Sequence, residues 1–395
     1  MKFAIHTLGC KINQYESNWI RENLIKGGLL EVDFKDKADV YIINTCTVTA
    51  EADRKSRQMA RQAKNRNLEA KVIVTGCYAN LNPEVFTDFE VVRDKKSIIP
   101  LLCGIFPENE LIYSPLDRER FFIKVQDGCD KFCTYCRIPY ARGHIVRSKP
   151  ISLVLKEMSN AIENGYSEIV LTGINIGLYG RDNDLKLLDL LVAIESTNCN
   201  ARFRISSIDP VDAYEILDFL RSSKKFVHHL HLSLQSGSDR ILKLMNRNYT
   251  SSFFLNLLHK LRMIDPLYSV STDIIVGFPS ENEKTVQDTV EILDSFEFSR
   301  VHIFPYSNRP MTAASMMKNQ LSPNKIKEYL SIVRKSSESS KIRYKNMLNG
   351  KEDFGIYEGG DKLLGQYYVS AIDSFKLNKS RNFVYKFRNG IMYAE

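Results

Sequence analysis

The sequence predicts an α/β protein built from three parts, and three observations support this. Short apolar runs alternate with polar, helix-like segments over the first 110 residues or so. The alternation restarts at Phe121, and the last stretch of about fifty residues holds only short strand candidates separated by Gly, Asp, Lys and Asn. These candidates are 354–357, 365–369 and 382–387. Strand–helix alternation implies a parallel sheet with crossover helices, whereas closely spaced short strands imply an all-β module.

We therefore expect an N-terminal parallel-sheet domain over residues 1–112, a larger α/β core over 115–346 and a small β module over 347–395. The predicted strands of the core are 121–126, 167–172, 202–208, 229–234, 270–276 and 300–305. The predicted helices are 151–164, 185–196, 211–223, 251–264 and 282–296. Six βα units are too few to close an eight-stranded barrel. An open, partial (βα)6 barrel is expected, with a lateral mouth for a large substrate.

Cys129, Cys133 and Cys136 form a C-x3-C-x2-C pattern directly after the first predicted strand of the core. Three such thiolates can hold three irons of a 4Fe–4S cluster, and the fourth iron is left open for a small molecule. An open iron is what a radical S-adenosylmethionine (SAM) enzyme needs. Zinc favours paired C-x2-C spacings with a fourth ligand, and no second pair follows here.

Cys10, Cys46 and Cys77 are far apart in sequence, but each ends a short apolar run that reads as a buried strand; the runs are 2–9, 40–45 and 71–76. Loops at the carboxyl ends of parallel strands gather at one edge of the sheet. The repeated placement therefore predicts a second three-cysteine cluster; the alternative is three small residues ending three strands by chance. Cys103 and Cys199 remain and are expected to be buried, inert thiols.

Bulk properties of the 395-residue chain favour a cytoplasmic enzyme. Eight cysteines in so long a chain are not a disulfide framework, and no apolar run approaches membrane-spanning length. The N-terminus carries no signal-peptide pattern. A net charge of +8 permits a polyanionic partner.

In combination, the motifs resemble those of the radical SAM methylthiotransferase family. They are Leu8–Glu16, Asn44–Thr49, Thr75–Ala79, Gln126–Gly143, Leu234–Ser238 and Val276–Pro279. Asn44–Gln58 and Thr134–Gly143 are most similar to the subgroup that acts on N6-threonylcarbamoyladenosine in tRNA. Two positions depart from the family pattern: Ser233 stands where Pro is expected, and Met311 stands where Gly is expected.

The resemblance implies two 4Fe–4S clusters and SAM as cofactors, and tRNA, an electron donor and a sulfur source as partners. It implies that SAM methylates sulfur carried on the Cys10/Cys46/Cys77 cluster. A second SAM on the other cluster is cleaved to a 5′-deoxyadenosyl radical, and a methylthio group passes to C2 of the adenosine beside the anticodon. The C-terminal module would correspond, loosely, to the family's TRAM domain.

Residues at predicted strand ends are candidates for contact with SAM. They are Tyr135, Gly173, Asn175, Ser206, Gln235 and Asp273. Turn or capping roles are the alternative for each. His229 and His231 share one side of a strand. They could bind a metal ion, but a packed or hydrogen-bonded pair is expected because no third ligand is evident.

Arg54, Arg57, Arg61 and Lys64 fall on one face of the helix predicted after Cys46. This face is either solvated or a contact for tRNA phosphates.

Three rival functions remain open. Two lie within the enzyme class: methylthiolation of isopentenyladenosine in tRNA, or of an aspartate in a ribosomal protein. The third is a non-catalytic iron–sulfur electron carrier or RNA-binding protein, which would not cleave SAM.

Overall fold

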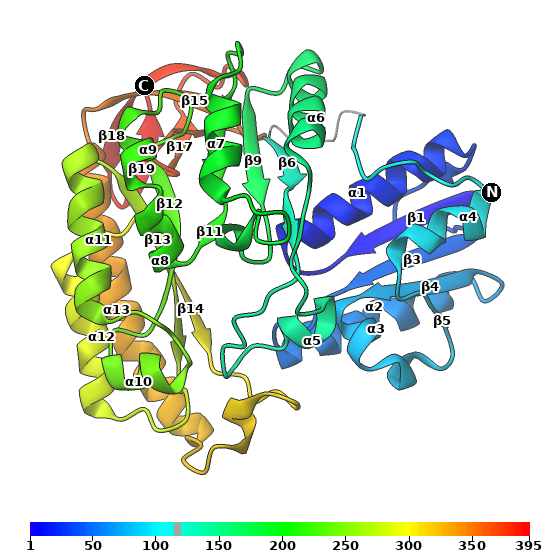
Figure 1. The fold of residues 1–395 in the computed structure, drawn as a ribbon, viewed down its shortest axis with the longest axis horizontal. Coiled ribbons are helices and arrows are strands. Elements are labelled where there is room, and N and C mark those ends of the chain that lie inside the picture. Colours follow the sequence, from blue (N-terminus) through cyan, green and yellow to red (C-terminus); the bar gives the residue numbers. More distant parts are fainter. Residues whose placement is uncertain (114–119) are drawn as a thin grey trace.

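The fold was determined as a computed structural model that describes residues 1–113 and 120–395. Three structural parts follow one another along the chain: a blue N-terminal sheet, a green and yellow half-barrel, and a red C-terminal barrel (Figure 1). This arrangement confirms the predicted α/β fold class. No helix in the described ranges combines the length and hydropathy required of a membrane span.

The N-terminal sheet is parallel and has the strand order β2-β1-β3-β4-β5. Its strands are β1 (Lys2–Thr7), β2 (Leu30–Glu31), β3 (Val40–Thr45), β4 (Lys71–Gly76) and β5 (Glu90–Val91). Its helices are α1 (Lys11–Lys26), α2 (Ala50–Arg66), α3 (Cys77–Leu81) and α4 (Ile98–Cys103). Every residue of β3 is buried, which explains why this strand reads as a continuous apolar run.

The half-barrel consists of two parallel sheets that meet at Ser206. The first holds β10 (Arg202–Ile205), β9 (Glu168–Thr172) and β6 (Arg120–Lys124), in that order. The second holds β11 (Ser207–Ile208), β12 (His229–Gln235), β13 (Ser269–Val276) and β14 (Arg300–Pro305). Strand β14 is an edge strand whose residues are all at least partly exposed, so the barrel is open on this side.

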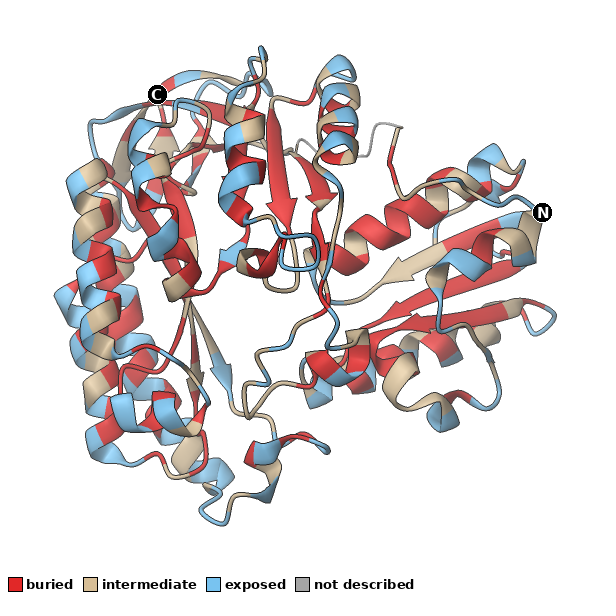
Figure 2. Ribbon diagram, viewed as in Figure 1, coloured by how far each residue is buried: buried red, intermediate tan, exposed pale blue. Residues whose placement is uncertain are grey.

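Helices cover the outer face of the half-barrel, and their buried residues face the strands (Figure 2). They are α6 (Ile151–Glu163), α7 (Leu187–Glu195), α8 (Pro210–Glu215), α9 (Leu217–Ser222), α10 (Asp239–Leu244), α11 (Ser251–Ile264), α12 (Glu283–Ser295) and α13 (Pro323–Leu348). The prediction of one continuous helix over 211–223 is wrong. It is divided at Ile216, whose φ of −104° and ψ of 7° are not helical. One apolar core runs from α1 (Trp19, Ile20) into β6 (Phe121, Ile123).

The C-terminal module is a closed five-stranded barrel with strand order β15-β16-β17-β19-β18. Its strands are β15 (Glu352–Tyr357), β16 (Lys362–Leu364), β17 (Ser370–Asp373), β18 (Arg381–Arg388) and β19 (Ile391–Ala394). The strand expected over 365–369 is a turn, in which Tyr368 takes a left-handed φ of +60°. Arg202 and Arg204 at the start of β10 donate hydrogen bonds to carbonyl groups of this module, including those of Phe354 and Leu364 (both 2.7 Å).

Candidate active site between the two cysteine loops

The three dispersed cysteines converge at the carboxyl edge of the first sheet. Cys10 follows β1, Cys46 follows β3, and Cys77 follows β4 and begins α3. The electrostatic influence of Cys77 and Cys10 reaches the Cys46 thiol, so the three sulfurs face a common space. A Cβ atom on Gly9, which has φ of +93°, would lie 2.6 Å from the Cys46 sulfur. Only glycine therefore lets the first loop approach the second this closely.

Buried amide side chains fix these loops. The side-chain nitrogen of Asn13 donates to the carbonyls of Leu8 (2.8 Å) and Thr45 (2.9 Å), which precede two of the cysteines. The side-chain nitrogen of Asn44 donates in return to the carbonyl of Asn13 (2.9 Å). Since these groups are buried, breaking any one bond would leave an unsatisfied polar atom, and the loops are held in one geometry.

The second triplet lies on the loop between the short strand β7 (Gln126–Asp127), which follows β6, and α5 (Ile138–Arg142). The backbone N–H of Ile138 donates to the Cys136 sulfur (3.4 Å), and Nη1 of Arg247 donates to the Cys133 sulfur (3.3 Å). Asp209 orients Arg247 through a 2.7 Å ion pair. Sequence reasoning missed Arg247 because it stands in no cysteine motif and not at a strand end.

The spacing within both triplets fits an iron–sulfur cluster better than one metal ion. Among the residues that the structure describes, only His231, Asp273 and His302 bring three metal-ligating atoms within 4.8 Å of one another. Zinc–sulfur bonds of about 2.3 Å would place cysteine sulfurs about 4 Å apart. At least one sulfur–sulfur distance in each triplet therefore exceeds 4.8 Å, which suits a 4Fe–4S cluster, where each cysteine binds a different iron.

The surroundings of the thiols also fit metal ligation. All eight cysteines are free of disulfides. Burial raises the pKa of Cys46 to about 12 and the pKa of Cys136 to about 12. Without a cation both thiols would stay protonated at neutral pH, so a bound cluster would supply the positive charge that ionises them.

A direct hydrogen bond joins the two cysteine loops. Nη1 of Arg137, the residue after Cys136, donates to the hydroxyl of Thr47, the residue after Cys46 (3.1 Å). Arg309 donates to the same hydroxyl (3.0 Å) and pairs with Asp53 on α2. The two triplets therefore border one space, although residues 46 and 136 are far apart in the chain.

A cavity of about 230 Å³ fills the space between the loops. It is lined by Thr47, Val48, Thr49, Tyr135, Cys136, Arg137, Ile138, Gln235, Asp273, Ile275, Phe304, Pro305, Tyr306 and Ser307. Three of the predicted SAM contacts thus come together here: Tyr135, Gln235 and Asp273. Phe304 is 40% exposed, so an aromatic face is available to a planar ring.

The other three predicted SAM contacts lie outside this lining. Gly173 follows β9, where an added Cβ would lie 2.9 Å from the Gln126 side-chain oxygen. The backbone N–H of Asn175 donates to that same oxygen (3.0 Å). Ser206 lies at the break between β10 and β11, and its buried hydroxyl has no partner among the described residues. An orphaned hydroxyl beside the barrel opening leaves a donor free for a ligand.

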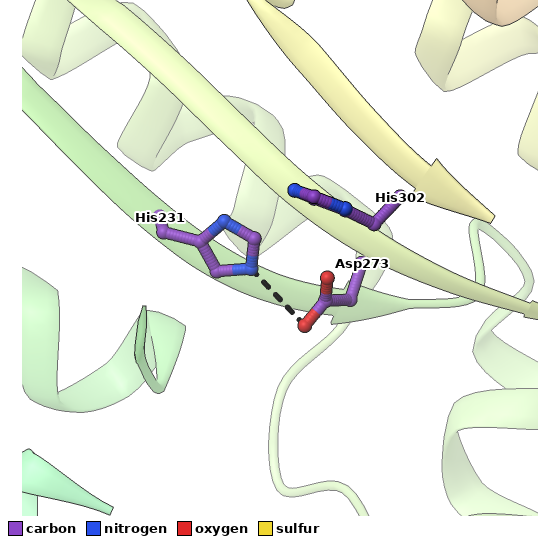
Figure 3. A group of neighbouring side chains, drawn as sticks. All are labelled: His231, Asp273 and His302. Atoms are coloured by element: carbon purple, nitrogen blue, oxygen red, sulfur yellow. Dashed lines mark ion pairs between the residues drawn. The ribbon is translucent and has the colours of Figure 1, made fainter. Parts of the chain in front are cut away.

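Histidines of the barrel interior form a connected group. Nε2 of His229 and Nδ1 of His231 each form a hydrogen bond with the Ser271 hydroxyl (2.9 Å each), so the two histidines are linked through this serine rather than to each other. Nε2 of His231 lies 3.0 Å from Asp273, and His302 stands beside them (Figure 3). The sequence-based view that no third ligand is near was wrong, since β13 and β14 bring Asp273 and His302 to His231.

The predicted basic face of α2 is only partly free. Arg54, Arg57 and Arg61 line a shallow depression with Gln58 and Gln62. Arg54 pairs with Glu51 on its own helix (2.6 Å), and Arg57 donates to the Tyr78 hydroxyl (2.6 Å). Lys64 is not in this depression and donates to the Ala70 carbonyl (3.2 Å). The remaining cysteines, Cys103 and Cys199, are partly rather than fully buried and pack against the apolar core.

A larger cavity of about 620 Å³ is lined by Cys77 and by Ala141 and Arg142 of α5 (Ile138–Arg142). Its wall carries the buried carboxylate of Glu16, which pairs with Arg142 (2.8 Å), Lys124 (3.3 Å) and Lys95. Burial alone would raise the pKa of Glu16, but these cations hold it well below its usual value. Glu16 is thus ionised and joins α1 to α5 and β6.

Family models match two parts of the chain. The model of the uncharacterized protein family UPF0004 matches residues 2–95, and the model of the radical SAM superfamily matches residues 123–293. Together they place one cysteine triplet in each matched region.

Curated relatives match nearly the whole chain. The chain is 40% identical over 384 residues to the threonylcarbamoyladenosine tRNA methylthiotransferase MtaB of Thermotoga maritima, which covers 92% of this chain and 86% of that protein. The protein of the same name from Aquifex aeolicus is 38% identical over 394 residues, covering 93% and 96%. A tRNA-2-methylthio-N(6)-dimethylallyladenosine synthase of Thermodesulfovibrio yellowstonii is 32% identical over 381 residues, covering 91% and 88%.

Solved structures support the fold. The radical SAM methyltransferase TsrM of Kitasatospora setae superposes with a TM-score of 0.59 at 14% identity, covering 80% of this chain and 77% of that chain. Together, the two family regions and the relatives imply two 4Fe–4S clusters and SAM as cofactors. With whole-length relatives at 40% identity and a cysteine triplet in each matched region, the chain belongs to the radical SAM methylthiotransferase family.

Proposed function

We propose that this protein adds a methylthio group to C2 of N6-threonylcarbamoyladenosine in tRNA. Relatives named for this reaction match 92% and 93% of the chain. The observation that carries the proposal is the Arg137–Thr47 hydrogen bond, because it holds both cysteine loops against a single cavity. A sulfur-carrying site and a radical-generating site must face the same substrate carbon, and this arrangement meets that requirement.

The clusters and SAM supply the radical chemistry that an unactivated C2–H bond needs. Cys10, Cys46 and Cys77 would hold the cluster that carries sulfur, and Cys129, Cys133 and Cys136 the cluster that binds SAM. Tyr135, Gln235 and Asp273 would orient SAM in the cavity, with Gly173, Asn175 and Ser206 as further contacts along the strand ends. Ile275, Phe304 and Pro305 give the lining an apolar side, which would exclude water from the reacting atoms once a substrate covers it.

The tRNA contact is proposed for the exposed face of α2. Arg57 and Arg61 border the depression there, and Arg54 would exchange Glu51 for a phosphate. Lys64 would contribute only through the general positive field. An electron donor and a sulfur source are further proposed partners. The proposed domains are 1–112, 115–346 and 347–395.

The substrate is tested with two tRNAs, one carrying threonylcarbamoyladenosine and one carrying isopentenyladenosine. Reconstituted enzyme with SAM and reductant should methylthiolate the first, as measured by mass spectrometry of nucleosides. Modification of only the second would contradict the proposed substrate and favour the dimethylallyladenosine synthase activity named for the relative at 32% identity. Modification of a ribosomal-protein aspartate instead of either tRNA would remove RNA from the proposal.

The roles of the two triplets are separated by variants. Replacing Cys129, Cys133 and Cys136 with Ala should halve the iron content from about eight per chain and abolish 5′-deoxyadenosine formation. Replacing Cys10, Cys46 and Cys77 with Ala should halve the iron content but leave SAM cleavage, while methylthio transfer is lost. Methylthiolated RNA from the second variant would show that the sulfur site lies elsewhere.

A further inference from the structure

Strand pairing gathers four polar side chains on one face of the second sheet of the half-barrel. His231 on β12 lies opposite Ser271 on β13, and Asp273 on β13 lies opposite His302 on β14. Alternate residues of a strand point to the same face of a sheet, so Ser271 and Asp273 share a face, and their partners on β12 and β14 share it with them. The group therefore exists only because three strands pair in this register.

Three of these side chains, those of His231, Asp273 and His302, point into one common space (Figure 3). One metal-ligating atom of each lies within 4.8 Å of those of the other two. Nε2 of His231 is 3.0 Å from a carboxylate oxygen of Asp273, which is already the separation of two ligands on one metal ion. Bonds of about 2.0–2.1 Å place tetrahedral ligand atoms about 3.3 Å apart, so the His302 ring would have to move by no more than about 1.5 Å.

His302 and Asp273 both have atoms to offer a ligand. Within residues 1–113 and 120–395, His302 makes no hydrogen bond, and its ring lies beside those of His231 and Phe304. It stands on the edge strand β14, whose residues are all at least partly exposed, so the ring has room to move. Only Oδ2 of Asp273 faces His231, which leaves the second carboxylate oxygen for the cavity.

Ser271 fixes the orientation of the His231 ring. Its hydroxyl oxygen lies 2.9 Å from Nδ1 of His231, so this ring nitrogen is engaged and Nε2 is directed toward Asp273. Histidines that bind metal ions are held in the same way, with one ring nitrogen hydrogen-bonded to a neighbour and the other on the metal. The same hydroxyl bonds to Nε2 of the buried His229 (2.9 Å), which holds the serine in place.

We infer that His231, Asp273 and His302 bind Zn²⁺ or a similar divalent metal ion. Two histidines and one carboxylate are a known ligand set of zinc sites that keep a further position open for water or a substrate atom. Asp273 lines the cavity between the cysteine loops, so an ion that it holds borders this cavity. The open position would take an oxygen ligand, such as a carboxylate, from a molecule in the cavity. The inference goes beyond the proposed function and does not depend on it.

The test titrates Zn²⁺ into anaerobic, cluster-loaded protein in the absence of SAM and RNA. We expect one zinc per chain, besides the iron of the clusters, to survive gel filtration in elemental analysis. X-ray absorption at the zinc edge should show only nitrogen and oxygen neighbours at about 2.0–2.1 Å. His302→Ala and Asp273→Asn should each weaken zinc binding at least about 100-fold, and Ser271→Ala about 10- to 100-fold. The control is His259→Ala, which removes an exposed histidine of α11 and should bind zinc as wild type does.

Three outcomes would overturn the inference. Wild-type protein that retains no zinc has no such site. Sulfur neighbours at about 2.3 Å would assign the zinc to cysteines. Equal zinc binding by His302→Ala and His259→Ala would mark the metal as an adventitious ion only. Iron content and melting temperature are measured for every variant, and zinc loss counts for the inference only where both are unchanged. No readout uses tRNA modification, so failure of the proposed function would be distinguished from failure of this site.

Discussion

Met311 shows at a single residue how a departure from the family pattern is accommodated. Its φ is +69°, in the left-handed region that glycine adopts freely, and its side chain is 55% exposed. A non-glycine residue in this region raises the free energy of the folded state by about 1–2 kcal/mol. Replacing it with glycine removes this strain, but part of the gain is offset because glycine loses more backbone entropy on folding. Met311→Gly should therefore raise the free energy of unfolding by about 0.5–1 kcal/mol. Urea denaturation under anaerobic conditions measures this change. Met316 is also strongly exposed, and Met316→Gly is the control that should give no gain in stability. A loss of stability in Met311→Gly would contradict the strain argument.

Ser233 departs from the pattern without strain. The register of β12 against β13 shifts between Leu232 and Gln235, so this position lies at an irregularity of the ladder. Its carbonyl accepts a 2.6 Å hydrogen bond from the Tyr249 hydroxyl, a bond that a proline would also permit. A proline would also fix φ near about −65° and remove the N–H group, and nothing in the structure explains why serine stands here.

Glu281 carries the clearest pH dependence, since burial raises its pKa to about 7. Its carboxylate accepts a hydrogen bond from the N–H of Gly277 (2.5 Å), at the end of β13. Between the usual pKa near 4.5 and about 7, the unfolded chain releases a proton that the folded chain keeps, so stability falls as pH rises. Across this pH window the free energy of unfolding of Glu281→Gln should rise relative to that of wild type by up to about 3 kcal/mol, because glutamine does not titrate. Melting temperatures of both proteins from about pH 5 to pH 8 measure the difference, and parallel curves would contradict it.

Helix α2 allows a prediction about RNA binding by a whole element. Reversing the charges of Arg57 and Arg61 to Glu should weaken tRNA binding and flatten its salt dependence, because fewer counterions are released. Reversal of Arg54 should have a smaller effect, since this side chain is engaged by Glu51. Filter binding across a salt series measures the slope, with Lys156→Glu as the matched charge control. An unchanged slope would assign the RNA contact to another surface, while iron content and SAM cleavage should persist in every variant.

Many of the strands and helices could be predicted, because the spacing of apolar residues follows from which side chains are buried. Strands β3, β9 and β13 are almost fully buried and were found within a residue or two. The turn at Tyr368 was misassigned as a strand because its aromatic residues face the half-barrel, where Tyr368 stacks on His229 (4.4 Å between ring centroids). One cysteine triplet was predicted from its C-x3-C-x2-C spacing and the other from the placement of its members at strand ends. Arg247, Arg137 and Thr47 were not found as site residues, because their role comes from contacts between distant parts of the chain.

At the scale of the whole molecule, Glu168 connects the half-barrel to the C-terminal module. Burial alone would raise its pKa, but Arg204 and Arg202 lower the pKa of Glu168 to about 2. Both arginines also donate to carbonyls of the module, so one charged group joins the two parts. Arg204→Met should lower the free energy of unfolding by about 2–3 kcal/mol and loosen the module. Thermal unfolding and limited proteolysis near residue 350 measure both effects. The double variant Arg204→Met/Glu168→Gln should recover part of the lost stability, because no unpaired carboxylate remains. No recovery in the double variant would contradict the role of the charge.

The hydrogen bond between Arg137 and Thr47 has a consequence for maturation of the enzyme. Because it links the loops that follow Cys136 and Cys46, ordering one loop lowers the entropic cost of ordering the other. Occupancy of the two metal sites is then thermodynamically coupled, and by reciprocity each site favours the other equally. Iron and sulfide titrated into the apoprotein should be taken up cooperatively, with few half-loaded molecules in native mass spectra. Thr47→Val should make loading independent, and half-loaded wild-type protein as the main early species would show that the loops mature separately.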